Sequence, residues 1–222
     1  MSDHDPVRLP DGGPARVHVQ GLRKSYAGRP VVTDLSLEVG AGEVVALVGP
    51  NGVGKTTLLR CLLGTESSDA GTVTLDGAPL RDQDPEVRRA VCAILDDAGF
   101  YPDVTVLEHL DVLARAHGVP DPDELVDAAL AELRIEHVAD QVPWTLSSGQ
   151  RRRLSLAVAL VRPWSLLVLD EPEQRLDADG RSWLADHLAA QAASGRSILM
   201  ASHDAGLVSR SGARVVELHG DV

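Results

Sequence analysis

Residues 49–57 of this 222-residue chain read GPNGVGKTT, which is the full spacing of a phosphate-binding loop. The apolar run EVVALV (43–48) leads into the loop, and TLLRCLL (57–63) follows it. These runs predict the strand and the helix that such a loop requires on its two sides. Glycines let successive backbone N–H groups point inward, and the helix adds the positive end of its dipole. The sequence therefore predicts an α/β core that binds a nucleoside triphosphate.

Lysine is otherwise almost absent from the chain. Lys24 and Lys55 are its only two lysines, and arginine supplies the remaining positive charge. The position that reaches the β- and γ-phosphates nevertheless holds Lys55, because a compact ammonium fits between two phosphates in a way that a planar guanidinium does not. We expect the hydroxyl of the next residue, Thr56, to ligate Mg²⁺.

The composition argues against a nucleic-acid partner. The net charge is −12, the pI is about 5.0 and aromatic residues make up 3% of the chain. Neither a basic field nor a stacking surface for bases is expected from such a chain. Two cysteines, Cys61 and Cys92, are too few for a disulfide framework or a metal cluster. Residues 1–15 are acidic and rich in proline and glycine, which predicts a flexible tail and no secretory signal.

Hydrophobic patterns predict the remaining elements. Alternating runs before residue 48 and GTVTL at 71–75 indicate antiparallel strands, and the Asp76-Gly77 pair indicates a hairpin turn. Residues 105–139 have a helical pattern that breaks at PDPD, where Asp121 and Asp123 are expected to begin the second helix. Further helical runs lie at 148–161 and 181–193, and buried-strand runs lie at 165–171, 197–202 and 213–219.

This alternation predicts the fold class. We expect an α/β P-loop NTPase core with a mostly parallel sheet, an antiparallel β subdomain and an inserted helical subdomain. One domain is expected over 16–222, with its helical subdomain at approximately 97–160. No stretch approaches the roughly 18 apolar residues of a membrane span. We therefore expect a cytoplasmic chain that reaches the inner face of the cell membrane only through a membrane subunit.

The apolar run SLLVLDE at 165–171 ends in two acidic residues. Asp170 at the strand end can hold Mg²⁺, and Glu171 beside it can orient or deprotonate an attacking water. Alone, this pattern indicates no more than the end of a strand. In a chain with a phosphate loop it predicts the acid that the metal ion requires.

Between these motifs, residues 146–150 read LSSGQ at the start of a predicted helix. With this segment the chain resembles the ATP-binding cassette (ABC) family, whose signature is Leu-Ser-Gly-Gly-Gln. The resemblance extends from Arg16 onward, and Ser148 stands where the family has a glycine. In the family two cassettes pack head to tail, and the signature of one closes on the γ-phosphate held by the other. The resemblance implies this role in trans for Ser147, Ser148, Gly149 and Gln150.

Other positions match the family one by one. Tyr26 resembles the aromatic residue that stacks on adenine, and His203 in MASHD resembles the histidine that touches the γ-phosphate. Asp177 resembles the aspartate of the D-loop at the dimer seam. The resemblance assigns catalysis to Glu171, His203 and Lys55, and metal binding to Thr56, Asp170 and Asp96. Its nucleotide-binding set is Tyr26, Gly49, Asn51, Gly52, Val53, Gly54, Lys55, Thr56, Thr57 and Asp96.

Two positions depart from the family pattern. Asp96 stands where the family has a glutamine that contacts Mg²⁺ and the attacking water. An aspartate keeps an oxygen ligand but adds negative charge, so we expect weaker or slower hydrolysis. In the D-loop, Gln174 and Arg175 stand where the family has small residues. This bulk favours an asymmetric dimer, or one with a different cassette, over a symmetric homodimer.

Phe100 and Tyr101 directly follow the Asp96 loop. In the family this segment receives a transmembrane permease subunit, so we expect the two aromatic residues to lie at that contact. The leading interpretation is the ATPase subunit of an ABC transporter, with export favoured over import by analogy. Two alternatives remain open at this point. One is a soluble, non-transport ABC ATPase of the iron–sulfur assembly type, and the other is a regulatory cassette with low turnover.

Overall fold

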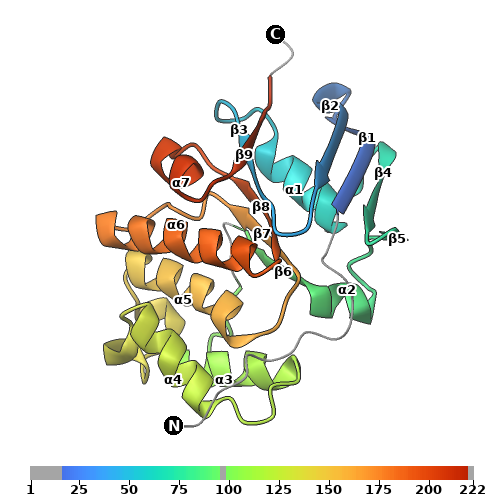
Figure 1. The fold of residues 1–222 in the computed structure, drawn as a ribbon. Helices are drawn as coiled ribbons and strands as arrows, with labels where there is room; N and C mark the ends of the chain where they lie inside the picture. Colours follow the sequence, from blue (N-terminus) through green and yellow to red (C-terminus); the bar gives the residue numbers. More distant parts are fainter. Residues whose placement is uncertain (1–16, 96–98, 220–222) are drawn as a thin grey trace.

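The computed structural model describes residues 17–95 and 99–219, which form two β-sheets flanked by helices (Figure 1). The strands are β1 (Val17–Tyr26), β2 (Arg29–Val39), β3 (Val44–Val48), β4 (Ala70–Leu75), β5 (Ala78–Pro79), β6 (Val91–Ile94), β7 (Leu166–Asp170), β8 (Ser197–Ala201) and β9 (Arg214–Glu217). The α-helices are α1 (Lys55–Leu63), α2 (Pro85–Ala90), α3 (Val106–Ala116), α4 (Asp123–Glu132), α5 (Ser148–Val161), α6 (Ala178–Ala193) and α7 (Ala205–Arg210). Short 3₁₀ helices lie at Glu136–Val138 and Pro143–Thr145.

A parallel sheet of five strands, in the order β6-β7-β8-β3-β9, is the centre of the molecule. Its strands β7 and β8 are buried along their whole length because both faces of the sheet are covered. In β3, Val45 and Leu47 pack into a core that contains α1 and the antiparallel strands. Val44 and Ala46 point to the opposite face, into a core that contains α3, α5 and α6. The predicted parallel α/β core is confirmed.

The strand order brings the predicted chemical motifs together. β3 precedes the phosphate loop, β7 ends in Asp170, and β8 precedes His203. These strands are neighbours in the sheet, because β8 pairs with both β3 and β7. Loops that follow adjacent parallel strands emerge at the same edge of the sheet, where α/β proteins bind their ligands.

The second sheet is antiparallel, in the order β2-β1-β4-β5. Central strand β1 pairs with both neighbours, and Val17 lies opposite Val39 on one side and Leu75 on the other. Asp76 and Gly77 have φ values of 49° and 80° at the turn between β4 and β5. Two successive left-handed residues are what the Asp-Gly pair predicts for a tight hairpin. The predicted antiparallel β subdomain and its hairpin are therefore both present.

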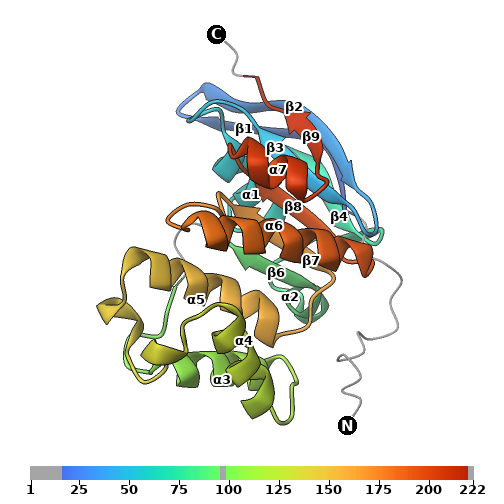
Figure 2. The same cartoon turned by 60° about the vertical axis from the view of Figure 1, so that its left-hand side comes forward.

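Helices α3, α4 and α5 pack on one another beneath the parallel sheet, away from the antiparallel sheet (Figures 1 and 2). Thr105 and Glu108 form a capping box at the start of α3. The expected role of Asp121 at the next helix is wrong, because Pro122 holds the N-cap position of α4 and the helix begins at Asp123. The 97–160 boundary of a helical subdomain stays a prediction.

Three short elements escape the sequence patterns. They are α2 and α7, with six residues each, and β6, with four. Runs this short do not complete two turns of a helix or the alternation of a strand, so periodicity does not reveal them. Strand β6 extends the parallel sheet beside β7, and Leu95 separates it from residues 96–98, which lie outside the described residues.

Candidate functional site

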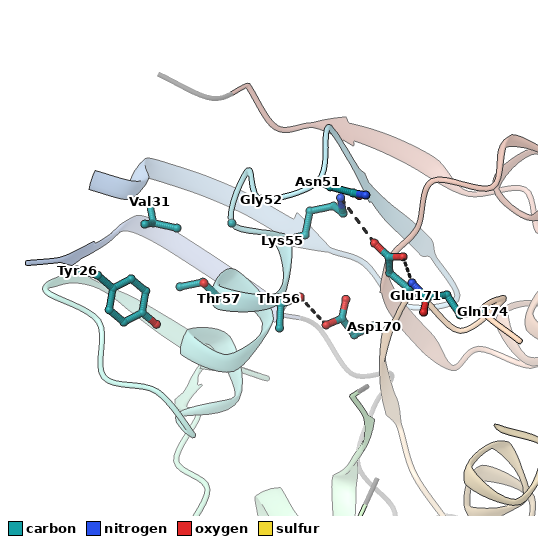
Figure 3. Close-up of a pocket in the computed structure, with 11 residues that line it drawn as sticks. Tyr26, Val31, Asn51, Gly52, Lys55, Thr56, Thr57, Asp170, Glu171 and Gln174 are labelled. Atoms are coloured by element: carbon teal, nitrogen blue, oxygen red, sulfur yellow. Dashed lines mark hydrogen bonds and ion pairs between the residues drawn. The ribbon is translucent and has the colours of Figure 1, made fainter. Parts of the chain in front are cut away.

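A cavity of about 480 Å³ lies between the phosphate loop and the acidic end of β7 (Figure 3). The residues that line it come from the antiparallel strands, the phosphate loop, the start of α1, the end of β7 and the segment after β7. They are Tyr26, Val31, Asn51, Gly52, Gly54, Lys55, Thr56, Thr57, Asp170, Glu171 and Gln174.

The phosphate loop needs glycine at its close contacts. Gly54 is the N-cap of α1 with φ 103°, and a Cβ there would lie 2.8 Å from the carbonyl oxygen of Val31. At Gly49 a Cβ would lie 2.6 Å from the carbonyl oxygen of Leu218. These glycines hold the loop tightly between the two sheets, with the N-terminus of α1 at the cavity.

Lys55 is held against its own loop. Its side chain is 5% exposed, and Nζ donates to the carbonyl oxygens of Gly49 at 2.8 Å and Pro50 at 3.3 Å. Nζ also lies 3.8 Å from Oε1 of Glu171, across the cavity (Figure 3). The ammonium group is thus fixed where an anion in the cavity would meet it.

Thr56 and Asp170 meet although 114 positions separate them in sequence. The Thr56 hydroxyl donates to Oδ2 of Asp170 at 2.7 Å, and the Asp170 residue is 2% exposed. A hydroxyl and a carboxylate oxygen side by side are ligands of the type that Mg²⁺ prefers. The two residues present therefore fit a magnesium ion.

Glu171 lies in an unusual backbone conformation with three donors around its carboxylate. Its φ is 43°, and its backbone N–H donates to the carbonyl oxygen of Ala201 in β8 at 2.8 Å. The side-chain amide of Gln174 donates to Oε2 (Figure 3). Nδ1 of His203 lies 3.0 Å from the same oxygen, and Lys55 approaches the other oxygen. The carboxylate faces the cavity in a geometry that can accept a proton from a bound water.

Arg152, on α5, supports this turn from behind, and sequence reasoning did not single it out. It is 6% exposed. Nη2 donates to the carbonyl oxygens of Asp170 at 2.8 Å and Glu171 at 2.6 Å, and Nε donates to that of Pro172 at 3.0 Å. The only sequence signal for it is the QRRR run, in which the middle arginine falls on the buried side of the helix.

Tyr26 lines the cavity at the far end from Glu171 (Figure 3). It is 45% exposed, and Nζ of Lys24 lies 4.9 Å from its ring centroid. Lys24 in turn pairs with Glu66 at 2.7 Å and donates to the carbonyl oxygen of Ser67 at 2.7 Å. The half-exposed ring thus lies at the cavity with a cation beside it, and an aromatic ring in such a place can stack on a flat ligand.

The signature segment lies at the start of α5 and does not line this cavity. Ser147 and Gln150 form a capping box, in which the Ser147 N–H donates to Gln150 at 2.8 Å and the Gln150 N–H donates to Ser147 at 3.3 Å. Ser147 and Ser148 are exposed. A Cβ at Gly149 would lie 3.2 Å from the carbonyl oxygen of Arg175, so the segment abuts the D-loop.

Asp177 caps α6 in the structure. Its carboxylate accepts from the Gly180 N–H at 2.9 Å and from Arg153 at 2.7 Å. The Gly180 backbone hydrogen bond, with a smaller contribution from Arg153, lowers the pKa of Asp177. Arg175, two positions earlier, is exposed with φ 64°. Both residues therefore lie on the surface, at the segment where the resemblance expects a dimer seam.

Phe100 and Tyr101 pack around a buried histidine on α3. The ring centroids of Phe100 and His109 are 5.4 Å apart, and those of Tyr101 and His109 are 5.3 Å apart. Tyr101 is 51% exposed, whereas His109 is 2% exposed. Burial lowers the pKa of His109, which keeps this ring neutral and apolar in character.

The structure brings most of the expected nucleotide-binding residues to one cavity. Gly49 and Val53 belong to the loop without lining the cavity, and His203 lies beside Glu171 at its edge. Asp96 lies outside the described residues. Gln174, expected only as bulk at a seam, also lines the cavity and donates to Glu171.

Comparison with known proteins identifies relatives of this chain. A family model described as "ABC transporter" matches residues 32–174. SkfA peptide export ATP-binding protein SkfE from Bacillus subtilis (strain 168) is 38% identical over 90% of this chain and 84% of its own length. Nod factor export ATP-binding protein I from Cupriavidus pinatubonensis is 37% identical, and this chain spans 62% of its length. Aliphatic sulfonates import ATP-binding protein SsuB 2 from Agrobacterium fabrum is 38% identical over 92% of this chain and 76% of its own.

Among solved structures, an ATP-binding subunit of an ABC transporter superposes with a TM-score of 0.83. It is 29% identical, and the match covers 91% of this chain and 85% of that one. In the part of the chain that the structure describes, no helix combines the length and the apolar character that crossing a membrane requires.

Proposed function

This chain belongs to the ABC transporter family as an ATP-binding subunit that hydrolyses ATP, and we propose that it drives export through a separate membrane subunit. The observation that supports ATP hydrolysis is the meeting of Lys55, Thr56 and Asp170 with Glu171 around one cavity. These residues come from two loops at the same edge of the parallel sheet. Nothing else in the described chain offers a phosphate loop beside a carboxylate in position to act as base.

In this proposal the residues divide the work of phosphoryl transfer. The loop N–H groups and Lys55 bind the β- and γ-phosphates, and Tyr26 stacks on the adenine. Glu171 accepts the proton of the attacking water, and His203 contacts the γ-phosphate from the end of β8. Thr56 and Asp170 would hold Mg²⁺, which when bound neutralises charge on the phosphates. Asp96 would be a further ligand.

We propose that two cassettes pack around two nucleotides. The signature residues Ser147 and Gly149 of one cassette would then donate to the γ-phosphate bound by the other. Support comes from their position at a helix N-terminus outside their own cavity, where Ser147 is exposed and Gly149 is half-buried, since that position favours an anion from elsewhere. Asp177 and Arg175 would lie at the seam. A bulky, left-handed Arg175 there favours an asymmetric pair or a different partner cassette.

The membrane subunit is proposed to dock at Phe100 and Tyr101. Tyr101 is half exposed yet anchored on His109, which is the arrangement expected of a contact residue whose orientation is already fixed. Such docking would hold the chain at the inner face of the membrane. Export is favoured because two of the relatives above are named for export and one for import.

The test begins with Mg²⁺-dependent ATP hydrolysis by the purified chain, alone and with its membrane subunit. Glu171→Gln should lower kcat by about 10²- to 10⁴-fold, the usual loss when a general base is removed, and should keep ATP binding. Size-exclusion chromatography with light scattering should show an ATP-dependent dimer of this variant. Glu86→Gln, an exposed residue on α2, is the matched control. Undiminished hydrolysis by Glu171→Gln would refute the assignment of the base.

Docking and direction need separate measurements. Tyr101→Ala should reduce co-purification of the membrane subunit without changing ATP affinity. Vesicles that contain the complex should move substrate in an ATP-dependent way, out of the compartment that contains ATP. Movement toward the ATP side would contradict export while leaving the ATPase assignment intact.

A further inference from the structure

Glu173 is a buried carboxylate beside the site that no role above uses. It is 5% exposed, and it does not line the nucleotide cavity. Glutamate is almost never buried this deeply unless its charge is compensated by partners. Its contacts therefore deserve a functional explanation.

One oxygen of Glu173 holds the segment that carries His203. Oε1 accepts from the Ser202 hydroxyl at 2.8 Å and from the His203 backbone N–H at 3.3 Å. The Asp204 N–H donates to Oγ of Ser202 at 3.1 Å, so this hydroxyl has an acceptor on one side and a donor on the other. The turn after β8 is thereby tied to the turn after β7.

The imidazole of His203 lies between two carboxylates. Its Nδ1 is 3.0 Å from Oε2 of Glu171 and 3.7 Å from Oε1 of Glu173. In the described part of the chain, Oε2 of Glu173 has no hydrogen-bond partner, although it is buried. Leaving a buried carboxylate oxygen without a donor costs free energy. Glu173 can therefore still accept a hydrogen bond from a donor close to it, such as the ring of His203.

This arrangement bears on how Glu171 becomes available to water. In the structure His203 and Gln174 both approach Oε2 of Glu171. These donors stabilise the charge of the carboxylate and make Glu171 a weaker base. Glu171 becomes a stronger base when the N–H of His203 moves to another acceptor, and Glu173 is a second carboxylate within 3.7 Å of that nitrogen.

We propose that Glu173 is a positioning residue for His203. On closure around ATP, Nδ1–H of His203 transfers its hydrogen bond from Glu171 to Glu173. The carboxylate of Glu171 is then available to the attacking water, and Nε2 of the oriented ring faces the γ-phosphate. No proton is transferred in this step, since only the hydrogen bond changes acceptor. The inference rests on the proposed function of Glu171 and His203.

The test uses Glu173→Gln, which keeps the size and one carbonyl oxygen but replaces the charged acceptor with a weaker neutral one. We expect kcat to fall about tenfold, while ATP affinity stays within about twofold and Tm within about 3 °C of the wild type. Glu86→Gln again controls for the loss of one negative charge. Unchanged kcat in Glu173→Gln overturns the proposal, and so does an equal loss of ATP affinity, because a positioning role acts on turnover alone.

A double-mutant cycle with His203→Ala separates positioning from a general structural effect. Single-turnover hydrolysis with enzyme in excess keeps slow variants measurable. If Glu173 acts through His203, adding Glu173→Gln to His203→Ala should change the rate by less than about twofold. The same tenfold loss in both backgrounds overturns the proposal. If His203→Ala shows no turnover, the effects of Glu173→Gln on kcat and on ATP affinity decide whether Glu173 is a positioning residue.

Different results would refute the proposed function and the role of Glu173. A wild-type chain without Mg²⁺-dependent hydrolysis, alone and with its membrane subunit, would refute the proposed function. An active wild type with an unaffected Glu173→Gln variant would refute only the role of Glu173.

Discussion

Removal of Arg152 should cost more stability than any exposed substitution in this chain. The guanidinium is buried in α5 and donates to three consecutive carbonyl oxygens, those of Asp170, Glu171 and Pro172. These carbonyls belong to the turn in which Glu171 has φ 43°. Arg152→Ala would leave three backbone acceptors without their charged donor, next to a strained residue.

The magnitude follows from the number and kind of bonds. A hydrogen bond to a charged group contributes about 1.5–3 kcal/mol. Because Nη2 serves two of the three carbonyls, we take the lower end and expect a loss of about 3–5 kcal/mol in the free energy of unfolding. For a chain of this size each kcal/mol lowers Tm by about 2–4 °C, so Tm should fall by about 6–20 °C.

The assay is thermal and urea unfolding followed by circular dichroism. Arg151→Ala, which removes a half-buried neighbour on the same helix, is the control and should cost less than about 1 kcal/mol. Arg152→Lys should recover part of the loss, since one ammonium reaches fewer carbonyls than the planar fork. A loss below about 1 kcal/mol for Arg152→Ala would show that the turn holds its conformation without this residue, and the reasoning would be wrong.

Three further predictions concern single side chains. Thr56→Ala removes a proposed metal ligand and the hydrogen bond to Asp170. The Mg²⁺ concentration that gives half-maximal hydrolysis should therefore rise about tenfold. An unchanged Mg²⁺ dependence would contradict the ligand assignment. Burial, opposed in part by nearby Arg162, raises the pKa of Cys92 to about 11. This thiol should therefore resist alkylation at pH 8 until the chain unfolds. Rapid alkylation of Cys92 in the folded chain would contradict its burial. Burial, with smaller contributions from Arg162 and Arg89, lowers the pKa of His117 from 6.5 to about 4. As the pH falls, His117 is protonated in the unfolded chain at a higher pH than in the folded chain. The free energy of unfolding should therefore fall as the pH drops from 6.5 towards 4. His117→Gln should flatten that part of the curve of Tm against pH, and an equally steep curve would refute the assignment.

Local patterns in the sequence were sufficient for the fold class and for most residues of the cavity. The phosphate loop is contiguous, so its spacing alone identifies Lys55 and Thr56. The buried runs of β7 and β8 are long enough to reveal strands. Glu171 could be assigned from its position at the end of the first run, and the resemblance to the ABC family singled out His203 after the second. Capping at Thr105 and Ser147 is local as well, because the partners lie three residues apart.

Tertiary structure alone decided which residues the side chains around the cavity contact. Thr56 meets Asp170, Arg152 in α5 reaches the backbone of Glu171, and Glu173 contacts Ser202 across 29 positions. Such contacts depend on the order of strands in the sheet and on helix packing, which no local periodicity encodes. The same reason explains why the sequence marked Gln174 only as a bulky residue and did not mark Glu173 at all. Residue type and spacing determined which chemistry this chain can carry out, and long-range packing decided which groups hold that chemistry in place.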